Sequence, residues 1–110
     1  MEAKSYDVVF LSNPRDINGV VHKYDEKNRD SSYFKDKIIA VKIMPLFPAY
    51  TTIPYVKAII LEESGYLSHV VIIAREFGKT VVRVPKGVMD KIIGKKISIK
   101  HKESKLYVVD

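Results

Sequence analysis

Short apolar runs separated by turn-forming residues dominate the first part of the chain. Mostly apolar runs at residues 6–11, 19–24 and 37–43 are bounded by Asn, Pro, Asp and Ser, which predicts three β-strands. Between the second and third runs, residues 25–32 (DEKNRDSS) offer no apolar side chain to a core. This segment is therefore predicted to be an exposed loop.

The middle of the chain is rich in proline. Pro45, Pro48 and Pro54 each remove a backbone donor and disfavour a helical conformation in the residue before them. Residues 44–55 are therefore predicted to form a structured but irregular connection, with room for one short helical turn. The run KAIIL at residues 57–61 follows, and its continuous apolar character predicts a strand covered on both faces.

Local signals conflict over residues 68–78 (SHVVIIAREFG). The β-branched residues at 70–73 favour a strand, whereas a helix is favoured by Ser68 as a cap and Gly78 as a terminator. Periodicity does not decide between the two. A helix here would carry apolar side chains around most of its circumference, so it would be largely buried, with only Arg75 and Glu76 on a polar stripe.

Apolar and polar residues alternate more regularly in the last part of the chain. It predicts a strand at 80–84, a Pro-Lys-Gly turn at 85–87, one or two helical turns at 88–93, and a C-terminal β-hairpin from 96–100 and 105–109. No internal repeat or linker is visible. The pattern as a whole predicts a single α/β domain over residues 1–110, β-rich and with short crossover helices.

Composition limits the kind of protein and the cellular environment that the chain fits. A chain of 110 residues with 46% hydrophobic content has enough apolar residues for one core. No cysteine is present, so disulfides and thiolate metal sites are excluded. No apolar stretch approaches the roughly 20 residues that span a bilayer, and the start MEAKSYD is unlike a secretory signal. We therefore expect a soluble, cytoplasmic protein without membrane association.

Reactive groups coincide with a predicted strand, turn and helix at residues 64–69 (SGYLSH). His69 would stand near a helix N-terminus, where free amide groups and the helix dipole favour an anion. Imidazole is a competent nucleophile near neutral pH, the Ser68 hydroxyl would donate to a phosphoryl oxygen, and Gly65 permits close approach of the backbone. A histidine beside a serine is, on residues alone, more often a helix cap or a buried neutral group. His22 and His101 lack metal-ligand spacing and are expected at the surface, and no metal site is predicted.

Several spaced motifs together resemble one protein family. The stretch EESGYLSHVVIIAREFG, followed by TVVRV and GKKISI, is similar to the phosphohistidine, or swivelling, domain of phosphoenolpyruvate (PEP)-utilising enzymes. That family includes phosphoenolpyruvate synthase, pyruvate phosphate dikinase and rifampicin phosphotransferase. The resemblance covers residues 37–109 and implies a swivelling β/β/α domain.

The resemblance also implies roles for individual residues. His69 matches the phosphorylated histidine and Ser68 its hydroxyl neighbour. Gly65 matches the second glycine of a pair, and Ser64 stands where the family usually has the first. The implied phosphate loop therefore consists of Ser64, Gly65 and Tyr66. The resemblance also implies supporting roles for three further residues: Glu62 matches the acidic residue before the glycines, and Arg75 and Glu76 match the helix motif.

In the family this domain carries a phosphoryl group from an ATP-grasp domain to a second active site. The resemblance therefore implies a phosphotransferase component that is not a complete enzyme alone. Its implied partner is a separate ATP-grasp subunit, which would hold ATP and Mg²⁺. A subunit that binds PEP or pyruvate is a further candidate partner. This domain itself is expected to bind no cofactor.

Two other functions remain open at this point. The chain could keep the swivelling fold without its chemistry and act as a binding or regulatory subunit, and the serine at position 64 favours that alternative. A net charge of +6 permits a nucleic-acid-binding domain but does not demand one, and no nucleic acid is expected as a partner.

Overall fold

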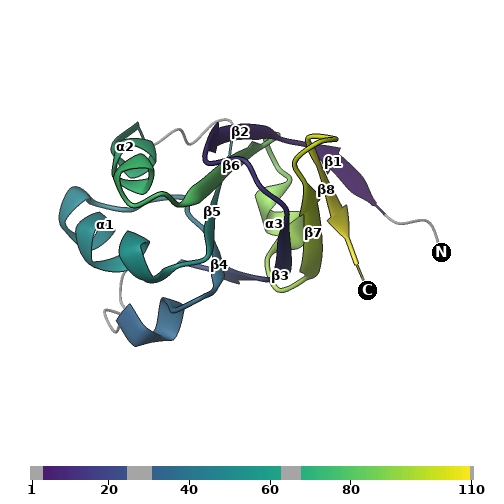
Figure 1. The fold of residues 1–110 in the computed structure, drawn as a ribbon. Helices are drawn as coiled ribbons and strands as arrows, with labels where there is room; N and C mark the ends of the chain where they lie inside the picture. The colour runs from purple at the N-terminus through teal and green to yellow at the C-terminus, as the bar shows by residue number, and fades with distance from the viewer. Residues whose placement is uncertain (1–3, 25–30, 63–67, 110) are drawn as a thin grey trace.

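Eight strands form one mixed sheet in the computed structural model, which describes residues 4–24, 31–62 and 68–109 (Figure 1). In chain order the strands are β1 (Ser5–Asp7), β2 (Val9–Ser12), β3 (Ile17–Lys23), β4 (Ile38–Ala40), β5 (Ala58–Glu62), β6 (Thr80–Val84), β7 (Lys96–Lys100) and β8 (Lys105–Val108). Across the sheet they run β1-β8-β7-β3-β4-β5-β6-β2. The predicted α/β class and the C-terminal hairpin of β7 and β8 are confirmed.

The strands β3, β4, β5 and β6 pair in parallel and form the centre of the fold. Alternate residues of β5 are buried on opposite faces: Ile60 belongs to one apolar cluster, and Ile59 and Leu61 belong to another. A strand covered on both faces needs apolar residues at every position. This requirement explains the continuous run at residues 57–61, and the predicted buried strand is confirmed.

The two clusters define two cores. The inner β core lies between the parallel strands and the antiparallel strands β7 and β8, and the helix α3 (Met89–Ile92) contributes Met89 and Ile92 to it. The helix core lies on the other face, beneath α1 (Leu46–Thr52) and α2 (Ser68–Glu76). Figure 1 shows α1 and α2 on one side of the parallel strands and β7, β8 and β1 on the other.

The strand β3 joins the two parts of the sheet. Its first residues pair with β7 and its last residues pair with β4. Gly19 lies in the middle of β3 with φ +151°, and a Cβ there would stand 3.2 Å from the side chain of Ile38. Glycine at this position therefore permits both the backbone conformation and the close approach of β4.

The predicted strand at residues 6–11 is wrong in one respect, because the chain divides there into β1 and β2. These two strands lie at opposite edges of the sheet, where β1 pairs with β8 and β2 pairs with β6. Val8 separates them: its amide donates to Ser104 O at 2.9 Å, and its side chain enters the inner β core. This single apolar run therefore forms both edge strands of the sheet.

The proline-rich connection is more helical than predicted. It forms α1, followed by a 3-10 turn, η2 (Ile53–Tyr55). Pro48 lies in the first turn of α1 and Pro54 is the second residue of η2. Amides in the first turn of a helix have no intrahelical acceptor, so proline is tolerated there. The prolines consequently mark helix starts instead of excluding helix.

The ambiguous segment at 68–78 is helical over Ser68–Glu76. Gly78 ends the helix at φ +65°: its amide donates to Arg75 O, and the amide of Lys79 donates to Ala74 O. These are the two bonds of a Schellman motif, and the predicted terminator is confirmed. The helix is less buried than predicted, because Ile72 is exposed and only Val70, Val71, Ile73 and Ala74 reach the core.

The remaining predictions differ only at element ends. The strand at 80–84 is confirmed as β6, while β4 is shorter than the predicted run 37–43 and α3 makes one turn. The predicted loop at 25–32 falls mostly on residues 25–30, which lie outside the described residues; a 3-10 turn, η1 (Ser31–Phe34), begins at its end. In the part of the chain that the structure describes, no helix is long and apolar enough to cross a membrane.

Candidate functional site

His69 is the second residue of α2, the helix that follows β5. It therefore lies at the end of the parallel sheet where β5 finishes. In sheets of this kind, ligands bind beyond the carboxyl ends of the parallel strands. The first turn of a helix also favours anions, because its amide groups are free and the dipole is positive there. The predicted location of His69 near a helix N-terminus is confirmed.

The imidazole of His69 is half-buried and hydrogen-bonded to the main chain. Its Nε2 lies 2.5 Å from the carbonyl oxygen of Met44. A carbonyl oxygen only accepts hydrogen bonds, so Nε2 carries the proton in this arrangement. In the neutral ring the lone pair then resides on Nδ1. The contact thus favours the tautomer in which Nδ1 is unprotonated.

The chain between β4 and α1 brings this carbonyl into place. The side chain of Met44 is buried in the helix core, and Pro45 directly precedes the first residue of α1. A residue before proline is restricted to extended conformations, which limits the directions its carbonyl can take. Because the acceptor is a main-chain atom, no residue type in the sequence marks it. Pro45 was the one visible signal at this place.

Glu62 and Ser68 border residues 63–67, which lie outside the described residues. Ser68 is the exposed first residue of α2, and Glu62 is the half-buried last residue of β5. The predicted loop residues between them, Ser64, Gly65 and Tyr66, lie outside the described residues. The roles predicted for all five residues stay predictions.

Lys42 and Asp90 form an ion pair at the same end of the sheet, and the sequence analysis missed Lys42. Its Nζ donates to Asp90 Oδ1 at 2.8 Å, and this hydrogen bond, the charge of Asp90 and the charge of Glu62 raise the pKa of Lys42. The same contact lowers the pKa of Asp90. Lys42 therefore stays a cation two residues before Met44. A lysine among many exposed lysines gave no signal of this placement.

The structure places Arg75 and Glu76 at the other end of α2. Arg75 Nε and Nη2 donate to Leu11 O at 3.2 and 3.0 Å, which ties the helix to β2. Glu76 is exposed. Arg75 is six positions after His69 in the helix, or about 9 Å along the axis. Any support that Arg75 and Glu76 give to the site therefore acts through the position of the helix, and their predicted supporting role stays a prediction.

The other histidines lie elsewhere. His22 is half-buried in β3, and burial followed by the charge of Lys37 lowers its pKa. His101 lies in the turn of the β7–β8 hairpin, where its amide donates to Asp16 Oδ1 at 2.9 Å. Among the described residues, no group of three or more His, Asp or Glu side chains could hold a metal ion.

Exposed apolar side chains surround the segment that carries Met44. Ile43 is 71% exposed and Phe47 is 81% exposed, although both are large and apolar. Leu46 and Tyr50 on α1 and Ile72 on α2 are also exposed. Exposed apolar patches of this kind are typical of surfaces that contact other proteins.

The fold and the histidine together define a class: a small α/β domain with a single imidazole presented at the start of a crossover helix. A family model described as "PEP-utilising enzyme, mobile domain" matches residues 38–109, from β4 to the end of the hairpin. The chain therefore belongs to this family, and the resemblance seen in the sequence is confirmed. A search of curated proteins finds no match.

Proposed function

We propose that this chain is a phosphoryl carrier, in which His69 accepts a phosphoryl group from an ATP-grasp partner and passes it to a second acceptor. Membership of the PEP-utilising family supports a phosphotransferase-type domain. The observation that carries the finer proposal is the hydrogen bond between His69 Nε2 and Met44 O, because it leaves one ring nitrogen ready to react. The domain acts as one component of a phosphotransferase.

In the proposed transfer, each bond that forms is matched by a bond that breaks. The lone pair of Nδ1 attacks the terminal phosphorus of ATP, a nitrogen–phosphorus bond forms, and the bond from phosphorus to the ADP oxygen breaks with its electron pair on ADP. The ring then carries a positive charge that the Met44 carbonyl stabilises through Nε2–H. When an acceptor attacks the phosphorus, the electron pair returns to Nδ1. The ATP and Mg²⁺ belong to the partner.

Two features favour the phosphorylated state. The start of α2 supplies the positive end of a helix dipole to the phosphoryl group, and the exposed Ser68 hydroxyl is adjacent in the chain and able to donate to its oxygens. The exposed residues around Phe47 offer the partner an apolar surface on α1. Swivelling of the whole domain would carry His69 from the donor site to the acceptor site.

The test is phosphorylation by the partner. The protein is incubated with ATP, Mg²⁺ and the ATP-grasp protein of the same cell, and the modified residue is located by mass spectrometry. We expect an acid-labile, base-stable phosphoryl group on His69 that is absent from His69→Ala. The matched control is His101→Ala, which removes a half-buried histidine of the hairpin turn and should be phosphorylated like the natural protein. Equal labelling of His69→Ala would contradict the proposal.

A second candidate function is a binding or regulatory subunit without chemistry. The serine at position 64 and the exposed apolar surface around Phe47 favour it, since binding needs only the surface. It predicts that His69→Ala binds the ATP-grasp partner as tightly as the natural protein and that neither is phosphorylated by any donor. Phosphorylation of the natural protein alone would exclude it.

A further inference from the structure

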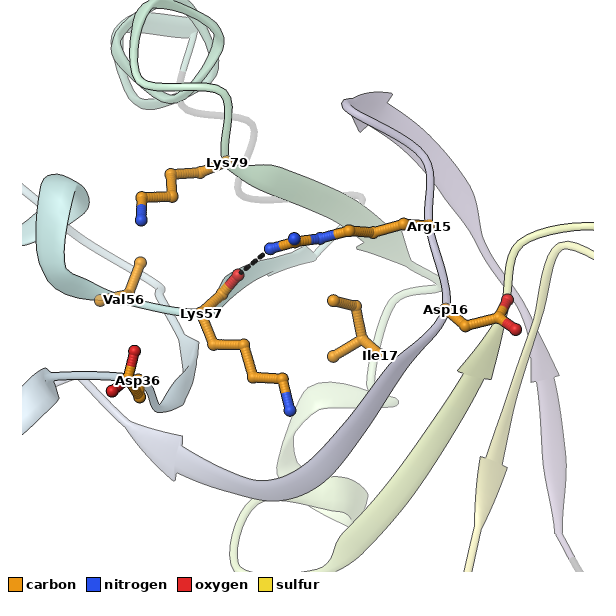
Figure 2. A pocket seen from close by; sticks show the side chains of 7 residues that line it. All are labelled: Arg15, Asp16, Ile17, Asp36, Val56, Lys57 and Lys79. Carbon is orange, nitrogen blue, oxygen red and sulfur yellow. Dashed lines mark hydrogen bonds between the residues drawn. The ribbon is translucent and has the colours of Figure 1, made fainter.

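A basic pocket lies at the end of the parallel sheet opposite His69. It has a volume of about 420 Å³ and is lined by Arg15, Asp16, Ile17, Asp36, Val56, Lys57 and Lys79 (Figure 2). Asp36, Lys57 and Lys79 shortly precede β4, β5 and β6, so the pocket opens at the amino ends of these strands. The five residues of β5 separate the two ends of the sheet by roughly 16 Å.

Hydrogen bonds hold Arg15 in the pocket. Its Nε donates to Thr80 Oγ1 at 2.8 Å, and its Nη2 donates to Lys57 O at 3.1 Å. These bonds orient the guanidinium group across the amino ends of β5 and β6, as Figure 2 shows for the bond to Lys57. A guanidinium group has five N–H donors, so donors remain for a ligand. The Thr80 hydroxyl in turn donates to Asn13 O, which fixes the acceptor of Arg15.

Two lysines complete the positive charge. Lys57 Nζ donates to Asn18 O at 2.7 Å and keeps two further protons. Lys79 is half-buried and lines the pocket, and its Nζ makes no hydrogen bond or ion pair with the described residues. Among the described residues, none of these three cations makes an ion pair with a carboxylate, and Arg15 and Lys57 keep donors that a ligand can use.

The carboxylates of the pocket do not balance this charge. Asp16 points away from the other lining residues in Figure 2, toward the hairpin, where its Oδ1 accepts the amide of His101. Asp36 alone remains at the rim, and it is exposed. Three cations from three separate segments thus face one carboxylate, and such an excess attracts a multiply charged anion.

We propose that this pocket binds a small phosphate-bearing molecule. Arginine and lysine donors recognise phosphate oxygens with short, charge-assisted hydrogen bonds, and the volume of the pocket is that of a small-ligand site. The pocket is separate from His69, so the ligand is not the transferred phosphoryl group. A ligand there would bind whether or not His69 reacts.

The experiment titrates the ¹⁵N-labelled protein with pyrophosphate at constant ionic strength and follows amide chemical shifts. We expect saturable shifts at Arg15, Lys57 and Lys79. Lys79→Gln should weaken binding at least about fivefold, because one charge-assisted contact is lost, whereas Lys79→Arg should retain binding. Lys86→Gln is the matched control: it removes the same charge from an exposed turn after β6 and should bind normally.

Three outcomes would overturn the proposal. The first is an absence of saturable shifts at the pocket residues. The second is equal weakening by Lys79→Gln and Lys86→Gln, which would show attraction to net charge alone. The third is equally tight binding of malonate, which would remove the preference for phosphate. His69→Ala should bind pyrophosphate unchanged, so this result is independent of the proposed carrier function.

Discussion

At the scale of single residues, the contact between His69 and Met44 indicates which imidazole nitrogen carries the proton. The sequence gives no reason to prefer one imidazole nitrogen, because residue types alone do not place a hydrogen-bond acceptor near either of them. The structure supplies the acceptor: the carbonyl oxygen of Met44 lies beside Nε2, so Nε2–H donates the hydrogen bond. Phosphorylation of Nε2 would first require this hydrogen bond to break.

The tautomer of His69 is directly measurable. In the neutral ring, we expect the two-bond ¹H–¹⁵N correlation pattern of His69 to show a protonated Nε2 and an unprotonated Nδ1. In the phosphorylated protein, coupling to ³¹P should appear at Nδ1. A protonated Nδ1 in the free protein would show that the Met44 carbonyl does not bind the ring in solution.

His22 gives a prediction for the dependence of stability on pH. Its pKa in the folded protein is lowered from 6.5 by burial and by Lys37, so the unfolded chain binds a proton more readily. This contribution to stability is complete above about pH 6.5 and is lost as the pH falls through the folded-state pKa. Urea unfolding at pH 7.5 and about pH 5 should show a smaller loss of stability on acidification for His22→Gln than for the natural protein. His101→Gln is the control, and a loss equal to that of the natural protein in both variants would contradict the assignment to His22.

At the scale of elements, a helix end marked by glycine could be predicted from the sequence. A strand boundary that depends on pairing with distant strands could not. Gly78 follows an apolar helix-length run, and its position alone predicted the terminator. By contrast, the division at Val8 depends on pairing with β8 and β6, which are more than 70 residues away. The proline in α1, Pro48, led to a wrong prediction for a different reason, since proline disrupts a helix interior but is tolerated in the first turn.

Gly78→Ala tests the terminator of α2. The backbone there has φ +65°, and an added Cβ would meet nothing within 4 Å, so the cost comes from the conformation alone. We expect the free energy of unfolding to fall by about 1 kcal/mol, measured by urea denaturation. Glu76→Ala, an exposed change in the same turn, should alter it by less than about 0.5 kcal/mol. Equal effects of the two changes would argue against the Schellman motif as the cause.

At the scale of the whole molecule, one parallel sheet couples two cores. The apolar composition of residues 57–61 predicted a strand covered on both faces, but it could not say what covers each face. In the structure, helices cover one face and the antiparallel strands cover the other, because β3 passes from β4 to β7. The same limit applies to the candidate site and to the basic pocket. His69 could be located from the sequence, whereas the position of Met44 O and the lining of the pocket depend on the tertiary structure.

The coupling of the cores predicts cooperative unfolding. Ile59 lies in the helix core and Ile60 lies in the inner β core, and both are fully buried. Each change to alanine should lower the free energy of unfolding by about 2 to 5 kcal/mol, with a single transition seen alike by tyrosine fluorescence and far-ultraviolet circular dichroism. A transition at different urea concentrations for the two signals would show that the cores unfold separately.

The division of the first apolar run at Val8 also bears on biosynthesis. On the ribosome, β1 and β2 emerge long before their partners, which are β8 and β6 respectively. β2 can pair only once β6 has left the exit tunnel, and β1 can pair only once the hairpin has left it. Nascent chains of this protein should therefore remain protease-sensitive until residue 108 is clear of the tunnel, and the native state should form only after that point.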